Sequence, residues 1–461
     1  MKKTYSLIVP FIYTLFLVSC NTETNFPDND KVIEDEKFVQ YGTPFAGVPE
    51  ISDINMYEVN PLVFSQQKNL DGVRQRLDEI QDLGINVIWL MPIHPIGQEK
   101  AFGSPYAVRD FYDINPSYGN MEDLRKLVSE AHERGMAVIL DLVANHTAWD
   151  NKWITENPSW YKQDGSGNIM IAENWSDVAA LNYDNPTLRS EMIDVMKYWV
   201  LEANVDGYRC DFAGGVPVDF WTEAIEELRD IPDRDIIMFA ESADKQLFNA
   251  DFDLIFGWDF QARLKEVFRE QRQASDLFTS NEADYRNVPN GADILRFTTN
   301  HDDNAWEDTP QNVFNTIEGS LAAFLITSYF GGVPMVYNGQ EIGVSDRIPF
   351  FFGTNYRINW AQNPHILEEY KRILKFRAES NAVRKGVLEN LGSTAAILSF
   401  KKTFQNEEVV VLVNTLGKDS EIQIPDSLKG SKWLNVLLDT EVVLENELAL
   451  SAYSYLILKE I

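Results

Sequence analysis

The chain has 461 residues, of which 44% are hydrophobic, so it exceeds one typical domain and can bury a large core. Its formal net charge of −31 argues against nucleic acid as a partner, because phosphates attract clustered Lys and Arg, and it disfavours electrostatic binding to anionic lipid. Neutral substrates remain compatible with such an acidic surface.

Residues 1–19 predict a signal peptide. A basic start, Lys2-Lys3, precedes a largely apolar stretch at 5–18 that is too short to span a bilayer comfortably. This stretch ends in Leu17-Val18-Ser19-Cys20, which resembles the lipobox of bacterial lipoproteins. We therefore expect cleavage before Cys20, acylation of its thiol, and a lipoprotein anchored to the membrane on the periplasmic or cell-surface side. An ordinary or uncleaved signal peptide is the alternative.

Residues 20–45 are rich in Asn, Asp, Glu and Thr without periodicity and predict a flexible tether. The segment 46–384 then alternates candidate strands with amphipathic stretches. Eight strand candidates, each followed by a helix, predict a closed (β/α)8 TIM barrel. The candidate strands are Ile54–Val59, Asn86–Met91, Ala137–Val143, Val205–Asp211, Ile236–Glu241, Asp253–Phe256, Ile294–Thr299 and Val333–Tyr337. The main helical candidates are Leu70–Leu83, Met121–Arg134, Pro186–Ala203, Pro217–Arg229, Asp259–Gln273, Val313–Tyr329 and Ile366–Glu379.

Two further regions depart from this alternation. The connection after the third strand, 147–184, is long and rich in Trp, which predicts an inserted loop subdomain that forms a wall of a substrate cleft. Residues 385–461 change to short alternating strands and predict a separate C-terminal antiparallel β-sandwich. Its candidate strands are Ala395–Lys401, Glu408–Asn414, Glu421–Ile424, Leu434–Leu437 and Ala452–Leu458.

Three acidic residues, Asp211, Glu241 and Asp302, each close an apolar run in the barrel segment. A carboxylate at a strand end is costly unless the strand opens into a polar pocket, so the three predict one shared site on the barrel rim. Retaining cleavage of a glycosidic bond needs two carboxyl groups roughly 5–5.5 Å apart, one as nucleophile and one as acid and base.

The neighbours of these carboxylates assign the roles. Arg209 lies two residues before Asp211 on the same side of the strand, so it should keep that nucleophile ionised. The apolar run before Glu241 should desolvate it and favour the protonated acid, while Asp302 would add a fixed charge. His146 and His301 also follow strands and can donate to hydroxyl groups.

Taken together, these segments resemble the α-amylase family of glycoside hydrolases over about residues 50–461. The motifs that carry the resemblance occur in the family's order: Asp141-Leu142-Val143-Ala144-Asn145-His146, Gly207-Tyr208-Arg209-Cys210-Asp211, Glu241, and Asn300-His301-Asp302, with Gly103-Ser104-Pro105-Tyr106 in support. The resemblance implies Asp211 as nucleophile, Glu241 as acid/base and Asp302 as transition-state stabiliser. It also implies that Tyr106, His146, Arg209 and His301 surround the sugar, with Tyr106 stacking on its ring and Asp141 behind the site.

One feature of this chain departs from the family pattern, and a second property of the family, calcium binding, is not decided by the sequence. Gly214 and Gly215 stand where many amylases have a Lys-His pair, which leaves contacts on the leaving-group side undetermined. The family often binds a structural calcium ion with help from the position of Asn145, and Asp177 offers an oxygen nearby. Calcium therefore stays open, and the chemistry itself requires no cofactor.

The resulting hypothesis is a lipid-anchored glycosidase that cleaves α-glucosidic bonds, α-1,4 in the first instance, in starch-like glucans or maltooligosaccharides. A transglycosidase or an exo-acting α-glucosidase would use the same residues. A non-catalytic glycan-binding lipoprotein is the remote alternative, and it is disfavoured because all three carboxylates are present.

Overall fold

The structure is a computed structural model that describes residues 37–461. The predicted signal peptide, the lipidation site Cys20 and most of the predicted tether lie outside these residues. Within the described part, no helix is both long enough and apolar enough to cross a membrane.

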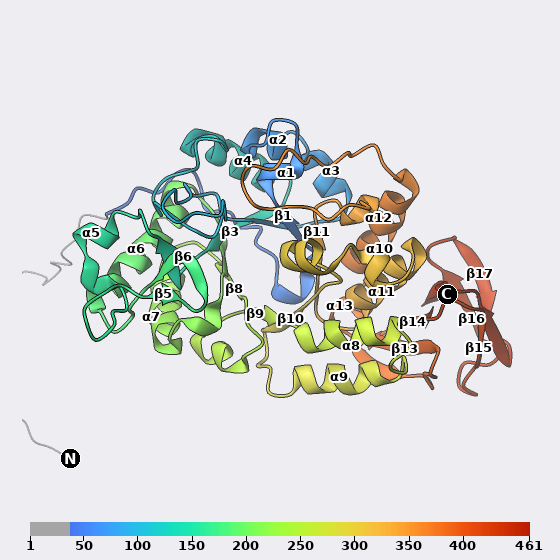
Figure 1. The fold of residues 1–461 in the computed structure, drawn as a ribbon. Helices are drawn as coiled ribbons and strands as arrows, with labels where there is room; N and C mark the ends of the chain where they lie inside the picture. Colours follow the sequence, from blue (N-terminus) through green and yellow to red (C-terminus); the bar gives the residue numbers. More distant parts are fainter. Residues whose placement is uncertain (1–36) are drawn as a thin grey trace, which may run out of the picture. The chain divides into compact units, whose positions relative to one another are not determined.

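Eight parallel strands close into a barrel, as the sequence predicts (Figure 1). In chain order they are β1 Met56–Val59, β2 Val87–Leu90, β3 Ala137–Leu142, β7 Gly207–Cys210, β8 Ile237–Ala240, β9 Leu254–Phe256, β10 Asp293–Arg296 and β11 Val333–Tyr337. The ring runs β1-β11-β10-β9-β8-β7-β3-β2, so β1 pairs with β11 to close it. Short buried strands of this kind leave their C-terminal ends free to carry a site at one rim.

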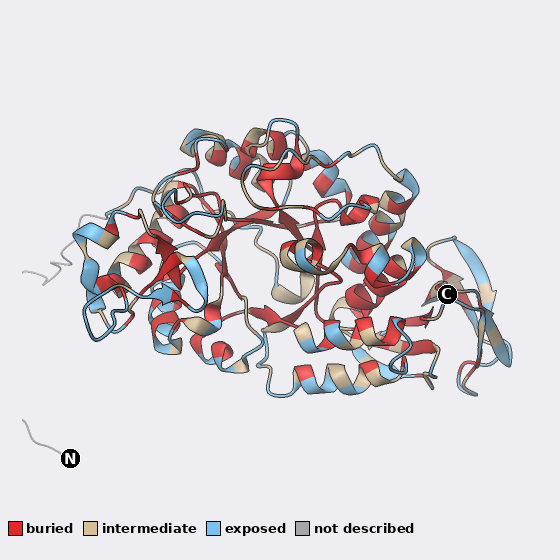
Figure 2. Ribbon diagram, in the orientation of Figure 1, coloured by how far each residue is buried: buried red, intermediate tan, exposed pale blue. Residues whose placement is uncertain are grey.

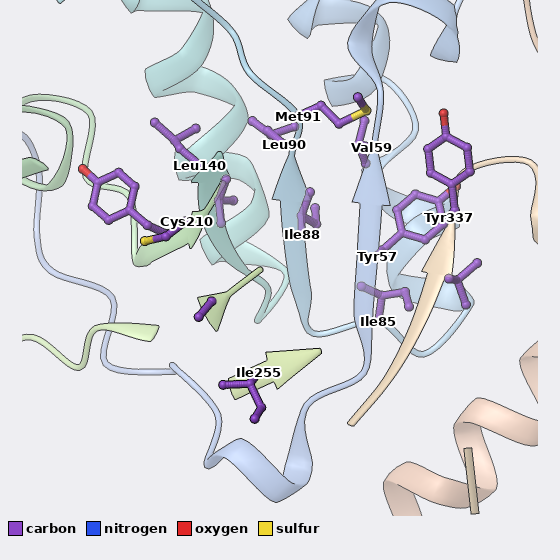
Figure 3. Packing of buried hydrophobic residues seen from close by; sticks show 14 of the residues in the cluster. Tyr57, Val59, Ile85, Ile88, Leu90, Met91, Leu140, Cys210, Ile255 and Tyr337 are labelled. Atoms are coloured by element: carbon purple, nitrogen blue, oxygen red, sulfur yellow. The ribbon is translucent and has the colours of Figure 1, made fainter. Parts of the chain in front are cut away.

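Alternation along the strands builds two cores. Met56, Trp89 and Phe239 point into the barrel and form one buried cluster with other inward side chains. The residues between them face outward and pack against the helices, and Figure 3 shows several of these. All strand residues of the barrel except Asp293 are buried, as the colouring of Figure 2 makes visible. Cys210 belongs to the outer cluster, so its thiol is buried on the face opposite to the predicted site.

Helices cover the outside of the barrel. The α-helices are α1 Pro61–Phe64, α2 Leu70–Arg74, α3 Leu77–Asp82, α4 Met121–Glu133, α5 Trp153–Glu156, α6 Pro186–Glu202, α7 Val218–Arg229, α8 Trp258–Phe268, α9 Asp276–Tyr285, α10 Pro310–Val313, α11 Ile317–Tyr329, α12 Pro364–Glu379 and α13 Asn381–Lys385. Asn120 caps α4 through a capping box and Asn185 caps α6 ahead of Pro186, which explains why these helices begin where they do.

Three helical predictions need correction. The stretch at 70–83 is divided into α2 and α3, and the stretch at 313–329 is divided near Asn315, which has a positive φ. Helix α9 was not predicted. After β8, where a helix was expected as after every other strand, the structure has a 3₁₀ segment, η4 Lys245–Ala250.

The insertion after β3 is a small antiparallel sheet. It contains β4 His146–Ala148, β5 Ile171–Ala172 and β6 Trp175–Ala180 in the order β4-β6-β5, and it packs on its own cluster of small apolar residues. Its first strand, β4, begins shortly after β3 ends at Leu142, so the insertion starts at the rim of the barrel.

The C-terminal region is antiparallel, as predicted. A six-stranded sheet has the order β12-β13-β14-β19-β16-β17, and β15 pairs with β18 in a second sheet. The bounds are β12 Val387–Asn390, β13 Ile397–Phe404, β14 Glu407–Asn414, β15 Ser420–Gln423, β16 Lys432–Asn435, β17 Thr440–Val443, β18 Glu447–Leu450 and β19 Tyr455–Glu460. Buried residues of both sheets share one cluster. Strands β12, β17 and β18 were not predicted because they are largely exposed and do not alternate cleanly.

Residues 38–45, the last part of the predicted tether, have no helix or strand but make contacts with the rest of the described chain. The Tyr41 N–H donates to the Leu201 carbonyl at 2.8 Å, and the Asn204 side chain donates to the Thr43 carbonyl at 2.9 Å. Phe45 stacks on His132 of α4 with ring centroids 4.3 Å apart. Contacts with α4 and with the end of α6 thus extend to residues before the predicted start of the barrel domain at residue 46.

Candidate active site

Two of the three predicted carboxylates follow neighbouring strands directly. Asp211 comes after β7 and Glu241 after β8, and the last residues of these strands, Cys210 and Ala240, are paired. The Glu241 N–H donates to the Cys210 carbonyl at 3.0 Å, so the strand ladder itself sets the position of this carboxylate.

Asp302 reaches the site in another way. Strand β10 ends at Arg296, and the segment after it leads to Asp302 ahead of a π-helical turn, Asp303–Glu307. The expectation that Asp302 closes a strand is therefore wrong. It nevertheless lines the same cavity as Asp211 and Glu241.

One guanidinium joins the two strand-end carboxylates. Arg209 is fully buried, and its Nη1 lies 2.8 Å from Asp141 Oδ1 and 2.9 Å from Asp211 Oδ1. Its Nη2 lies 2.9 Å from Glu241 Oε1. Sequence spacing predicted the contact with Asp211 alone. A buried cation needs such partners to offset the loss of hydration.

Burial decides the protonation of these carboxyl groups. Desolvation raises the pKa of Glu241, and the charge of Asp211 adds to this, against the opposing effect of Arg209. Desolvation also raises the pKa of Asp211, although the charge and hydrogen bond of Arg209 lower it. Asp141, behind them, has its pKa raised to about 7, first by burial. Three carboxyl groups around one guanidinium favour retention of a proton within the cluster.

Phe212 completes the environment of Glu241. It has a positive φ of 44°, an uncommon conformation for a bulky residue, and its N–H donates to Glu241 Oε2 at 2.7 Å. A Cβ on Gly215 would lie 2.4 Å from the Phe212 ring, so a side chain at that position would displace it. The glycine at position 215, where the family pattern has a larger residue, thus leaves the space that the Phe212 ring occupies.

A second set of hydrogen bonds crosses the barrel. Tyr106 Oη lies 3.1 Å from Asp141 Oδ2 and 2.9 Å from His301 Nε2, and its ring stacks on that of His301. His301 Nδ1 lies 2.6 Å from Glu58 Oε1. Sequence reasoning missed Glu58, although a lone charged residue inside the apolar run of β1 was the signal that could have found it.

His146 and Asn145 lie at the start of the insertion. Both are buried, and His146 has its pKa lowered to about 4 by burial, so it is a neutral donor at ordinary pH. Asn145 Nδ2 is 3.3 Å from His146 Nδ1. Within residues 37–461 no group of three or more His, Cys, Asp or Glu is arranged to hold a metal ion. The calcium role of Asn145 thus stays a prediction that no step below uses.

These residues open into a cavity of about 530 Å³, a size typical of small-molecule sites. The insertion supplies Trp175 and Asp177 to its wall, as expected of the loop. Sequence reasoning did not place Phe102 and Trp306 here, which are 69% and 66% exposed at the rim. The lining also includes Ser104, Tyr106, His146, Asn174, Ser176, Val178, Asp211, Phe212, Glu241, His301, Asp302, Phe350 and Phe351. Aromatic faces beside carboxylates suit a sugar, which has apolar faces and hydroxyl edges.

Comparison with known proteins agrees with this geometry. The family model described as the alpha amylase catalytic domain matches residues 58–166 and 155–365. Among relatives, Alpha-amylase 3 of Dictyoglomus thermophilum is 27% identical, over 85% of this chain and 89% of its own length. The intracellular maltogenic amylase of Bacillus subtilis is 26% identical, over 75% of this chain and 61% of its own.

Solved structures agree in fold. The noncanonic maltogenic alpha-amylase AmyB of Thermotoga neapolitana superposes with a TM-score of 0.80 at 28% identity, covering 90% of this chain and 100% of that one. An alpha-amylase of Lactobacillus plantarum gives a TM-score of 0.80 at 26% identity, covering 89% of this chain and 100% of that one.

Proposed function

Because the chain belongs to the alpha-amylase family of glycosidases, we propose that it cleaves α-1,4-glucosidic bonds in starch-like glucans or maltooligosaccharides with retention of configuration. The observation that carries the proposal is the single guanidinium of Arg209, which contacts both Asp211 and Glu241. The pair lies at adjacent strand ends, facing a cavity with aromatic walls. The names of the relatives, which are alpha-amylases and maltogenic amylases, support glucans as the substrate class.

In this mechanism Asp211 attacks the anomeric carbon while Glu241 protonates the departing oxygen. Asp211 is the better carboxylate because Arg209 acts on it through both charge and a hydrogen bond, and His301 also lowers its pKa. At Glu241 burial and the charge of Asp211 raise the pKa, against the opposing effects of Arg209 and the Phe212 N–H, and we assign the proton to Glu241 on this balance. Glu241 then deprotonates the water that releases the sugar from Asp211.

The remaining residues hold the sugar at the cleavage point. Asp302, whose side chain is 47% exposed, can accept from sugar hydroxyl groups and add negative charge near the oxocarbenium-like centre. His146 and His301 line the same cavity and face the hydroxyl groups of the sugar. The chemistry requires only these side chains and water, with no metal ion or organic cofactor.

The nucleophile assignment is tested with Asp211→Asn on maltoheptaose and starch. The amide cannot form the glycosyl-enzyme, so turnover should fall by at least about 10³-fold. Asp219→Asn on α7 is the matched control, since its carboxylate is 75% exposed and bonded to Arg189 outside the cavity. Equal turnover by wild type and Asp211→Asn would remove Asp211 from the reaction.

The product profile decides between the alternatives. Proton NMR of the first product should show the α anomer, because retention leaves the configuration unchanged. A ladder of short products indicates internal cleavage, release of glucose alone indicates an exo-acting α-glucosidase, and products longer than the substrate indicate a transglycosidase.

We propose further that Cys20 carries the lipid anchor. Cys20→Ser should move the protein from the membrane fraction to the soluble fraction and abolish incorporation of a labelled fatty acid. The only other cysteine supplies the control, because Cys210 is buried and Cys210→Ala should leave both readouts unchanged. Retained label in Cys20→Ser would refute the anchor without touching the glycosidase assignment.

A further inference from the structure

Glu58 is a carboxylate in the middle of the barrel that the proposed reaction does not use. It lies on β1 between β11 and β2, opposite Tyr337 and Trp89, and none of its surface is exposed. An unpaired charge in such a position costs several kcal/mol, and removal of its partner would expose that cost. The Glu58 contact with a group that can carry a positive charge is the 2.6 Å approach to His301 Nδ1.

The hydrogen bonds between Asp141, Tyr106, His301 and Glu58 determine how many protons these residues hold. Both oxygens of Asp141 face N–H donors, with Arg209 at 2.8 Å from Oδ1 and Trp89 at 3.1 Å from Oδ2, which favours the ionised form. Tyr106 Oη is within 3.1 Å of Asp141 Oδ2 and has one proton, which it donates to that carboxylate. Its 2.9 Å contact with His301 Nε2 is then satisfied when Nε2 donates.

The contact between His301 and Glu58 therefore needs a second proton. With Nε2–H committed to Tyr106, the 2.6 Å separation of Nδ1 and Glu58 Oε1 must also contain a proton. That proton belongs either to the imidazole, which becomes a cation beside a carboxylate, or to Glu58, which becomes a neutral acid beside a neutral ring.

The surrounding charges favour the imidazolium. Imidazole is ordinarily the stronger base, and although burial raises the pKa of Glu58, the charge and hydrogen bond of His301 and the charge of Arg209 lower it. Burial alone lowers the pKa of His301, but the charges of Asp302 and Glu58, with the Glu58 hydrogen bond, raise it to about 9. Arg209 opposes this, and Asp141 and Asp211 add to it. The ionisable and charged groups that face His301 are Glu58 of β1, Tyr106 after β2, Asp141 of β3, Arg209 and Asp211 at β7, and Asp302.

We propose that Glu58 is a positioning residue that holds His301 as an imidazolium, with Nε2–H directed at Tyr106 and the cleft. His301 lines the cavity, so the imidazolium places a positive charge beside the sugar and strengthens the hydrogen bond that its Nε2–H makes to Tyr106. The role in catalysis rests on the proposed function. The protonation state does not.

Histidine NMR tests the protonation state directly. The chain has five His, so a long-range ¹H–¹⁵N spectrum of ¹⁵N-histidine-labelled protein is simple, and His301→Gln assigns the signal. In the wild-type protein both ring nitrogens of His301 should have imidazolium shifts at about pH 7.5, where an ordinary His is mostly neutral. His94 is an internal neutral reference, because burial lowers its pKa to about 4. A neutral His301 with its proton on Nε2 would overturn the proposal, since it would leave the second proton on Glu58.

Glu58→Gln tests the cause. The amide keeps the shape of the side chain and removes its charge, so the His301 midpoint should fall from about 9 by at least two pH units. Glu341→Gln is the matched control, because Glu341 is also a buried glutamate, beyond the end of β11, but it contacts Tyr57 rather than a histidine. An unchanged His301 midpoint in Glu58→Gln would overturn the role of Glu58. If that variant fails to fold, the wild-type spectrum still decides whether His301 is a cation.

The ratio of wild-type to Glu58→Gln kcat/KM gives the functional readout. Glu241 titrates in both proteins, so its effect on kcat/KM cancels when the two values are divided. With His301 returned to its ordinary pKa, the ratio at about pH 8 should exceed the ratio at about pH 5.5 roughly thirtyfold. A ratio independent of pH would mean that the residue is structural and would refute the catalytic benefit. An inactive wild-type enzyme with an imidazolium His301 would instead refute the proposed function alone.

Discussion

Arg209 determines the charges of the proposed site, because it is the cation that three buried carboxylates share. Its guanidinium contacts Asp141, Asp211 and Glu241 with separate N–H groups. Trp89 also lies under it, with the guanidinium carbon 4.9 Å from the ring centroid. A planar fork can satisfy several acceptors at fixed angles, whereas an ammonium group acts as a point charge.

We expect Arg209→Lys to lower kcat about a hundredfold, since the ammonium group cannot aim both reacting carboxylates. The pH dependence should change in a defined direction. Burial raises the pKa of Asp211 and Arg209 opposes it, so loss of the guanidinium raises that pKa further. Because Asp211 must be ionised to attack, activity on the acid side should be lost at a higher pH than in the wild-type enzyme.

The measurement is kcat/KM on maltoheptaose as a function of pH. Arg189→Lys is the matched control, because Arg189 also contacts two carboxylates, those of Asp219 and Glu223, at the surface of α6. It should keep the wild-type profile. An acid limb of Arg209→Lys that coincides with the wild-type limb would contradict the role assigned to the guanidinium.

The sequence predicted the site residues best where they directly follow the end of a strand. Asp211 and Glu241 were identified because each follows an apolar run directly, and β7 and β8 do end one residue before them. Asp302 was assigned to a strand end by the same rule, although β10 ends earlier, at Arg296. Local hydrophobicity does not record which neighbour a strand will pair with, so this difference was beyond sequence reasoning.

Contacts between elements were also the part of the site that sequence reasoning could not reach. Glu58 and His301 are far apart in the chain and meet only in the closed barrel, where β11 alone separates β1 from β10. Trp306 reaches the cleft from the π-helical turn after Asp302 and Phe350 from the loop after β11, with ring centroids 6.1 Å apart. Sequence reasoning assigned neither of them to the site, and only the fold brings them together.

Closure of the barrel is the property on which the whole molecule depends, and one buried residue supports it. Arg377 of α12 is 1% exposed, and its guanidinium donates to the carbonyl groups of Ile54, Ser52, Ser328 and Gly332 and to Asn55 Oδ1. These acceptors precede β1 and β11, the two strands that close the ring. Burial lowers the pKa of Arg377 to about 10, yet it stays charged at neutral pH.

We expect Arg377→Met to lower the free energy of unfolding by at least about 3 kcal/mol, because it leaves several buried acceptors without donors. Arg377→Lys should recover little of this, since three N–H groups cannot reach acceptors arranged for a planar fork. Urea denaturation followed by fluorescence measures the effect. Arg372→Met on the same helix is the control: its side chain is 54% exposed and paired with Glu369, so it should cost less than about 1 kcal/mol. Equal midpoints for the Arg377 and Arg372 variants would mean that closure of the ring does not depend on this residue.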